Sequence, residues 1–359
     1  MDVNKLSDIY TDYLLACQGQ ITATGISEFT GNTICHDQFT RLLSSGFFSS
    51  ESLWKKTKSM CHEIRNSEAV LIFDDSIEEK KYTDSNELMQ WHFDHTVGRC
   101  VKGVNFLTAL YHSNDISLPV CVDFVKKTKP SINKKGKAIM KSEITKNEMF
   151  RNMLYQSSYN LDFKYVLNDS WFSSVENMAF CKIVCKKDFI MAVKDNRRVA
   201  LSQEDKKNGV YVNIKSLGLE ECVMSVYFEK LDFPILLSKQ VFKNGDGSTG
   251  ELYLASSDLS LTFSQITTIY KKRWKVEEYH KSIKSNAAFS KSPTRTPKTL
   301  ISHFIASITA YVKLELIKIR TSKNHFALKS KINMAATKAA YLELRKLSTP
   351  ISNLDLDFA

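Results

Sequence analysis

Hydrophobic and polar residues alternate with a helical period over the first part of the chain. Apolar side chains recur three or four positions apart, as in Ile9, Tyr13 and Cys17. This spacing places them on one face of a helix. The pattern therefore predicts a small N-terminal helical domain at residues 1–66.

Strand-like patterns replace the helical period from about residue 68. The apolar run at 69–73 stops at Asp74 and Asp75, which predicts a buried strand that ends at two carboxylates. A second run, at 165–168, stops in the same way at Asp169. Carboxylates that end neighbouring strands of one sheet can lie close together, so these acids are candidate site residues.

Further elements complete a sheet with helices around it. Two apolar runs in 103–125 flank a polar turn and predict a β-hairpin. Helices are expected near 142–157 and from Ser174, and a strand at 188–194. This order predicts an α/β core of a mixed sheet flanked by helices, whose first part spans 67–196.

The pattern changes twice more before the chain ends. Residues 197–260 alternate like short strands separated by turn residues, which predicts a β-rich insertion. The second part of the core is expected at 261–320, where Thr262 and Gln265 have the form of a capping box at a helix start. Residues 321–359 are expected to form a C-terminal helical tail.

Composition indicates the kind of binding partner and the cellular compartment of the protein. The 359 residues hold 50 Lys and Arg against 39 Asp and Glu, a net charge of +11, which favours a polyanionic partner such as nucleic acid. The longest strongly apolar run is far below the roughly 20 residues of a membrane helix, and no export signal opens the chain. We therefore expect a cytoplasmic protein without membrane contact. The eight cysteines form no C-x₂-C pair, so we expect reduced thiols and no zinc site.

A predicted helix at 266–286 carries the strongest chemical pattern. At about 100° per residue, four polar side chains fall in one stripe about 60° wide: Tyr270, Arg273, Glu277 and Lys284. An ordinary basic surface helix with an Arg273–Glu277 ion pair is the alternative. That alternative does not explain why two acids follow strands earlier in the chain.

This stripe resembles a known family signature. Its spacing matches the Y-(2)-R-(3)-E-(6)-K signature of bacterial insertion-sequence transposases of the DDE type. The sequences FDDS at 73–76 and VLNDSWF at 166–172 resemble the two acidic motifs of that family. The order acid, acid, insertion, acid is also that of the family. The resemblance covers roughly residues 20 to 310.

The resemblance implies a ribonuclease H-like core in which Asp75, Asp169 and Glu277 are catalytic and bind two divalent ions, Mg²⁺ or Mn²⁺. Three oxygen ligands near a phosphate suit Mg²⁺, and two such ions can support an in-line displacement at phosphorus. Alternation along the strand cannot choose between Asp74 and Asp75. We prefer Asp75 because the family's acid directly precedes a hydroxyl residue. Asp162 is a weaker rival of Asp169, since it lies before its strand.

The resemblance also implies contacts with DNA around the acids. Arg273 and Lys284 would hold phosphates, and Tyr270 would bind a phosphate or stack on an extruded base. For Trp171 and Trp274 we favour packing over a role as a base wedge.

Two further segments are candidate DNA contacts. Residues 21–46 have helix-turn-helix character, with an ordinary helical hairpin as the alternative; with the resemblance, recognition of the transposon's terminal repeats is the preferred interpretation. The lysine-rich run at 126–146 is a candidate electrostatic grip on phosphates. The N-terminal candidates for DNA binding are His36, Gln38, Arg41, Lys55, Lys56 and Lys58.

The function that the resemblance implies is DNA transposition. The protein would cleave insertion-sequence ends and transfer the 3′-OH into target DNA, by cut-and-paste, as a homodimer that pairs two ends. Its partners would be double-stranded transposon ends and target DNA, and it would be associated with the nucleoid. A catalytically inactive DNA-binding regulator and a stand-alone Mg²⁺-dependent nuclease are the alternatives.

Overall fold

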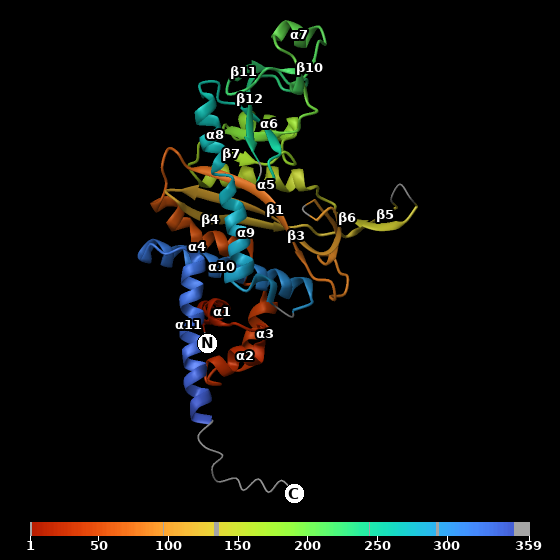
Figure 1. The fold of residues 1–359 in the computed structure, drawn as a ribbon. Helices are drawn as coiled ribbons and strands as arrows, with labels where there is room; N and C mark the ends of the chain where they lie inside the picture. The colour runs from red at the N-terminus through yellow and green to blue at the C-terminus, as the bar shows by residue number, and fades with distance from the viewer. Residues whose placement is uncertain (1, 96, 133–135, 244, 292–293, 348–359) are drawn as a thin grey trace, which may run out of the picture.

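A computed structural model describes residues 2–347 except 96, 133–135, 244 and 292–293. Its centre is a nine-stranded sheet in the order β11-β12-β13-β8-β7-β1-β3-β2, with β4 also paired to β3. Strands β1, β7 and β8 run parallel, and the other neighbours are antiparallel. Helices lie around this sheet (Figure 1). The architecture confirms the predicted mixed α/β class and is ribonuclease H-like.

The strands of the first part of the core form where the sequence is mostly apolar on both faces, except β2, which lies at the edge of the sheet and is largely exposed. They are β1 (Val70–Glu79), β2 (Gln90–Asp94), β3 (Arg99–Ser113), β4 (Ile116–Phe124), β7 (Tyr165–Asn168) and β8 (Asp188–Val193). The predicted hairpin is confirmed as β3 and β4. Its turn residues Asn114 and Asp115 have φ of 50° and 60°, a left-handed conformation that these residue types tolerate better than most.

Strand β1 does not end at the two acids, as the sequence predicted. It continues to Glu79 because β3 pairs with it along its whole length. On the other side, β7 pairs only with Val70–Ile72. Asp74 and Asp75 therefore lie in mid-strand, just beyond the end of β7, where one edge of β1 is open.

Different helices cover the two faces of β1. Phe73 packs against Phe150 of α5 (Lys146–Asn160). Phe106, which pairs with Ser76 and so lies on the opposite face, packs against His280 of α9 (Trp274–Asn286). Side chains alternate along a strand, so Asp74 lies on the α9 face and Asp75 on the α5 face.

The predicted β-rich insertion is β-rich, but most of it belongs to the main sheet. Strands β9 and β10 form a separate small sheet, whereas β11, β12 and β13 continue the main sheet beyond β8. The elements of this region are β9 (Arg198–Val199), α7 (Gln203–Lys207), β10 (Val212–Asn213), η2 (Ile214–Ser216), β11 (Val223–Val226), β12 (Ile235–Lys243) and β13 (Thr249–Ser256).

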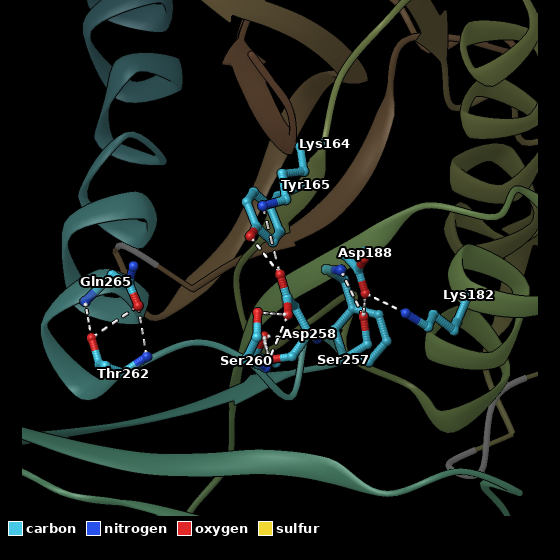
Figure 2. A network of polar contacts seen from close by, with 11 residues as sticks. Lys164, Tyr165, Lys182, Asp188, Ser257, Asp258, Ser260, Thr262 and Gln265 are labelled. Atoms are coloured by element: carbon cyan, nitrogen blue, oxygen red, sulfur yellow. Dashed lines mark hydrogen bonds and ion pairs between the residues drawn. The ribbon is translucent and has the colours of Figure 1, made fainter. Parts of the chain in front are cut away.

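A polar network fixes the return from β13 to the second part of the core (Figure 2). Asp258 accepts hydrogen bonds from the Tyr165 hydroxyl at 2.7 Å and from Ser260. The predicted capping box then begins α8 (Phe263–Lys271): Thr262 and Gln265 each accept from the backbone of the other. The network ties the start of α8 to β7, and so positions the segment that carries Glu277.

The predicted helix at 266–286 is two helices, α8 and α9. Between them the backbone makes tighter i to i−3 hydrogen bonds, from Arg273 N to Tyr270 O at 2.9 Å and from Val276 N to Arg273 O at 3.1 Å. A turn of this kind winds by more degrees per residue than an α-helix. Residues before and after it therefore do not share the stripe that was predicted.

Helices from both ends of the chain pack together. Helix α1 contacts α3, α10 and α11, and these helices lie together in Figure 1. Helix α10 is apolar and long enough to cross a membrane, but 78% of its most apolar window is buried inside the protein, so it is a core helix. Residues 348–359 of the predicted tail lie outside the described residues. The helices are α1 (Val3–Ala16), α2 (Ala23–Phe29), α3 (His36–Ser45), α4 (Ser50–Glu63), η3 (Phe289–Lys291), α10 (Pro297–Thr321) and α11 (His325–Leu347).

Two smaller features complete the fold. A two-stranded hairpin, β5 (Lys129–Ile132) with β6 (Ala138–Lys141), projects from the body of the molecule (Figure 1). After β7, the chain forms α6 (Val175–Ala179) and a π-helical turn at Phe180–Val184. A helix from Ser174 was predicted for this segment.

Candidate active site

Of the five carboxylates that line one cavity of about 700 Å³, Asp94 ends β2 and the other four come from three distant segments. These four are Asp74 and Asp75 of β1, Asp169 directly after β7, and Glu277 of α9. The open edge of β1 beyond Ile72 exposes the first pair to the cavity, the end of β7 adds the third, and α9 brings the fourth. The three acids predicted from sequence, Asp75, Asp169 and Glu277, are thus brought to one place.

Asp74 and Asp75 have different partners because they point to opposite faces of β1. A carboxylate oxygen of Asp74 lies within 4.8 Å of ligand atoms of Glu277 and His280. Asp75 instead accepts hydrogen bonds from Lys146 Nζ at 2.8 Å and from Asn105 Nδ2 at 3.0 Å. Asp74, the alternative to our preferred Asp75, is therefore the carboxylate that faces Glu277.

Negative charge is concentrated around Asp74. Burial, followed by the charges of Asp169 and Glu277, holds the pKa of Asp74 well above its usual range. Arg273 opposes this effect, with Nη1 3.7 Å from Asp74 and 3.4 Å from Glu277. Burial also raises the pKa of Asp169, whose Oδ1 accepts the backbone N–H of Trp171 at 2.9 Å.

The donor set fits divalent cations. Carboxylates that are buried and repel one another gain most from a cation between them, because it removes the repulsion that raises their pKa values. Hard oxygen donors beside an open cavity suit a dication that keeps part of its water shell. The residues present can therefore hold the metal that the resemblance implies.

Arg273 and Lys284 lie beside these acids, as predicted, but Tyr270 does not face the cavity. Lys284 lines the cavity and its Nζ donates to Ser76 Oγ and to Ile77 O, both at 3.1 Å. Tyr270 is 8% exposed and its hydroxyl donates to Asn168 O at 3.2 Å. The predicted phosphate contact of Tyr270 would require this hydroxyl to leave the end of β7, next to Asp169.

Sequence reasoning missed several residues of the cavity, among them His280, and it named Lys146 only as the last residue of the lysine-rich run at 126–146. Lys146, at the start of α5, binds Asp75 and lies 4.1 Å from the ring centroid of Trp171. His280 lines the cavity from α9, and burial, with Lys284 and Arg273, lowers its pKa to about 3. The available signal for His280 was its position three residues after Glu277, which places both on one helix face.

Of the two tryptophans expected to pack, one does not. Trp171 is half-buried, packs edge-on against Phe172 and lines the cavity. Trp274, the first residue of α9, is 63% exposed, so the expectation that it packs is wrong.

The N-terminal candidates lie elsewhere on the molecule. Residues 21–46 form two short helices, α2 and α3, with His36 and Gln38 in the first turn of α3 and Arg41 just past its middle. In α4, Lys55 pairs with Glu51 at 2.8 Å, and Lys56 Nζ donates to Ser7 Oγ at 3.1 Å. Lys58, in the same helix, is exposed. None of these six candidates lines the cavity of the four carboxylates.

A mixed sheet whose acids converge beside an arginine and a lysine is typical of metal-dependent nucleases. Comparisons with protein families agree. A family described as DDE superfamily endonuclease matches residues 2–207, more than half of the chain, and one described as transposase DDE domain matches residues 142–313. The chain belongs to the DDE superfamily of transposases and endonucleases.

Comparisons with individual proteins add little to this assignment. No curated protein matches the chain. Among solved structures, an endonuclease V from Bacillus subtilis is similar over 76% of this chain and 94% of its own, with 7% sequence identity and a TM-score of 0.24.

Proposed function

We propose that this protein is a DNA transposase that cleaves the ends of an insertion sequence and joins the freed 3′-OH to target DNA, by cut-and-paste. The observation that carries the proposal is the convergence of Asp74, Asp169 and Glu277 in a cavity whose walls also carry cationic side chains. The membership of the DDE superfamily supports the same chemistry.

Asp74, Asp169 and Glu277 are the residues that would hold two divalent ions, Mg²⁺ or Mn²⁺. Asp74 replaces our sequence-based choice, Asp75, because it lies on the face that α9 covers. When bound, two such ions activate the attacking oxygen and stabilise the leaving one. Asp75 instead orients Lys146.

The cationic residues have separate parts in this proposal. Lys146 and Lys284 line the cavity, where they can bind the phosphates that flank the scissile bond. Arg273 lies between Asp74 and Glu277, so it holds their carboxylates apart and in place before a cation binds.

DNA outside the cavity would be held by two further parts of the molecule. The hairpin β5–β6 continues into α5, which carries Lys146 at the cavity, so a duplex bound at the acids can extend along it. The N-terminal helices α2 and α3, with His36, Gln38 and Arg41, are the proposed readers of the terminal repeats. Two copies of the chain would pair two DNA ends.

A strand-transfer assay with point variants tests the proposal. The substrate is a labelled duplex that carries the end of the encoding element, incubated with target plasmid and with Mg²⁺ or Mn²⁺. We expect Glu277→Gln and Asp74→Asn to lower cleavage at least a hundredfold while end binding, measured by gel shift, is retained. Asp75→Asn should retain more activity than Asp74→Asn. Normal nicking by Glu277→Gln would remove Glu277 from the site.

The products of the unmodified protein separate the alternatives. Joined products support a transposase. Hydrolysis without joining would indicate a stand-alone nuclease, and DNA binding without any metal-dependent cleavage would indicate an inactive regulator. Either of the last two results would overturn the proposed strand transfer.

A further inference from the structure

His280 is a buried side chain at the acidic cavity with an unexplained polar atom. It is 6% exposed, and its Nε2 is fully buried without a hydrogen-bond partner in the described part of the chain. Buried polar atoms without a partner are uncommon and need a physical reason. The ring packs edge-on against Phe106, with centroids 5.6 Å apart, and this contact restricts its orientation.

The same imidazole lies beside two carboxylates. A ring nitrogen of His280 and carboxylate oxygens of Asp74 and Glu277 all lie within 4.8 Å of one another. Two atoms that bind one metal at 2.0 to 2.2 Å are at most about 4.4 Å apart. Two of the three donors can bind one ion from opposite sides at nearly this spacing, and rotation of the side chains would bring the third to the shorter distance of an adjacent ligand.

We propose that His280 supplies a nitrogen ligand to the dication held by Asp74 and Glu277, and that this site therefore prefers a transition dication such as Mn²⁺ to Mg²⁺. The proposal rests on the proposed function, since it concerns the same site. Carboxylates and water suit both ions, whereas an imidazole ligand favours transition metals. Mg²⁺ dehydrates reluctantly and takes oxygen ligands, so a nitrogen donor adds little to the affinity of the site for Mg²⁺.

The arrangement along α9 makes the pairing with Glu277 possible. Glu277 and His280 are three residues apart in one helix, so both side chains leave the same face. Asp74 approaches that face from β1. The three donors thus come from two rigid elements, and their spacing does not depend on a loop.

Electron paramagnetic resonance of the full-length protein with Mn²⁺ tests the ligand directly. Mn²⁺ affinity is measured from the signal of the free ion, and electron spin-echo modulation reports a nitrogen bound to the ion. We expect nitrogen modulation in the unmodified protein. In His280→Gln the modulation should disappear and the Mn²⁺ affinity should fall about tenfold or more, while Mg²⁺ affinity, measured by competition, falls less.

His95→Gln is the matched control. His95 lines the same cavity from after β2 but does not share the cluster with Asp74 and Glu277, so this variant should keep the modulation. Circular dichroism in EDTA checks that His280→Gln folds. The spectrum of the unmodified protein tests the proposal even if a variant does not fold. Mn²⁺ that binds to the unmodified protein without nitrogen modulation would overturn the proposal.

The outcomes separate this inference from the proposed function. Nitrogen modulation that persists in His280→Gln removes His280 as the ligand and leaves the carboxylate site standing. Mn²⁺ binding that is unchanged in both Asp74→Asn and Glu277→Gln would instead overturn the metal site on which the proposed function depends.

Discussion

The two adjacent aspartates of β1 show how strongly a single position in a strand decides the surroundings of a side chain. Asp75 pairs with Lys146 on the α5 face, whereas Asp74 lies among Asp169, Glu277 and His280. A buried, charged carboxylate that faces other carboxylates destabilises the fold unless a cation is bound. The charge of Asp74 is therefore unfavourable in the metal-free protein.

The stability of the metal-free protein should depend on the charge of Asp74. Its pKa in the folded state is raised above the unfolded value, which is about 3.9. The charged form therefore destabilises the fold above the folded pKa, and this penalty shrinks as the pH falls through the folded pKa. Asp74→Asn should raise the Tm in EDTA at neutral pH, and the gain should vanish toward pH 4.

Thermal melts across this pH range, with Asp75→Asn as the control, check the prediction. Removing Asp75 leaves Lys146 without its partner at 2.8 Å, so this variant should not gain stability. A gain for Asp74→Asn that is equal at every pH would contradict the electrostatic explanation.

At the residue scale, part of the site could be predicted and part could not. The spacing of Arg273, Glu277 and Lys284 is kept in the structure because all three lie at or after the start of α9. The choice between Asp74 and Asp75 could not be made, because the strand is apolar on both faces and only the position of α9 decides it. For His280 the signal was its position three residues after Glu277, on the same helix face, and a single histidine at such a position does not by itself indicate a metal ligand.

At the element scale, the break between α8 and α9 turns Tyr270 toward the end of β7. No glycine or proline marks this break; the bridging residues are Lys272 and Arg273. A regular helix was therefore the natural prediction, and the error in the place of Tyr270 follows from it. The start of α8, by contrast, was predictable, because Thr262 and Gln265 form a capping box with a local sequence signature.

Loss of the cap at the start of α8 should lower stability by about 1 kcal/mol. In the unmodified protein the Thr262 hydroxyl oxygen accepts the Gln265 N–H at 3.3 Å, and in Thr262→Ala this acceptor is lost. Thr262→Ser keeps a hydroxyl and should remain close to the unmodified protein. Denaturant unfolding measures both variants, and equal losses for Ala and Ser would mean that the hydroxyl contributes nothing.

At the scale of the whole molecule, the hairpin β5–β6 is a cationic projection. Lys129 and Lys141 pair directly across its two strands, an arrangement of like charges that destabilises an isolated ladder. A bound polyanion removes this penalty. The lysine-rich run at 126–146, a candidate electrostatic grip on phosphates, thus includes the two strands of this hairpin and the first residue of α5; residues 133–135 lie outside the described residues.

Replacing both lysines should weaken DNA binding and its dependence on salt. A lysine that no longer neutralises a phosphate lowers the steepness of log affinity against log salt by about 1. The double variant Lys129→Ala and Lys141→Ala should therefore reduce this slope by about 2. Fluorescence anisotropy with a duplex at several salt concentrations measures the slope.

The control for this experiment changes Lys207 and Lys230, two exposed lysines of the region around α7. This second double variant should leave the slope unchanged, because its lysines lie far from the hairpin along the chain and line no part of the acidic cavity. Equal slopes in the two double variants would exclude the hairpin as a DNA contact.

Global topology was the part of the fold least visible in the sequence. Alternation in 197–260 predicted strands correctly, but nothing local indicated that β11, β12 and β13 pair onward from β8. Pairing partners distant along the chain are chosen by the complete core. The same is true of α1, which packs against α10 and α11.

The packing of α1 has a consequence for how the protein is made. Domains generally fold in the order in which the ribosome releases them. Here α1 can pack against α2 and α3 soon after its own synthesis, but its contacts with α10 and α11 form only when those helices emerge, long after α1. A gene copy interrupted by a frameshift before α10 would therefore yield a fragment with an uncovered apolar surface, which proteases remove, and not a stable competitor of the intact protein.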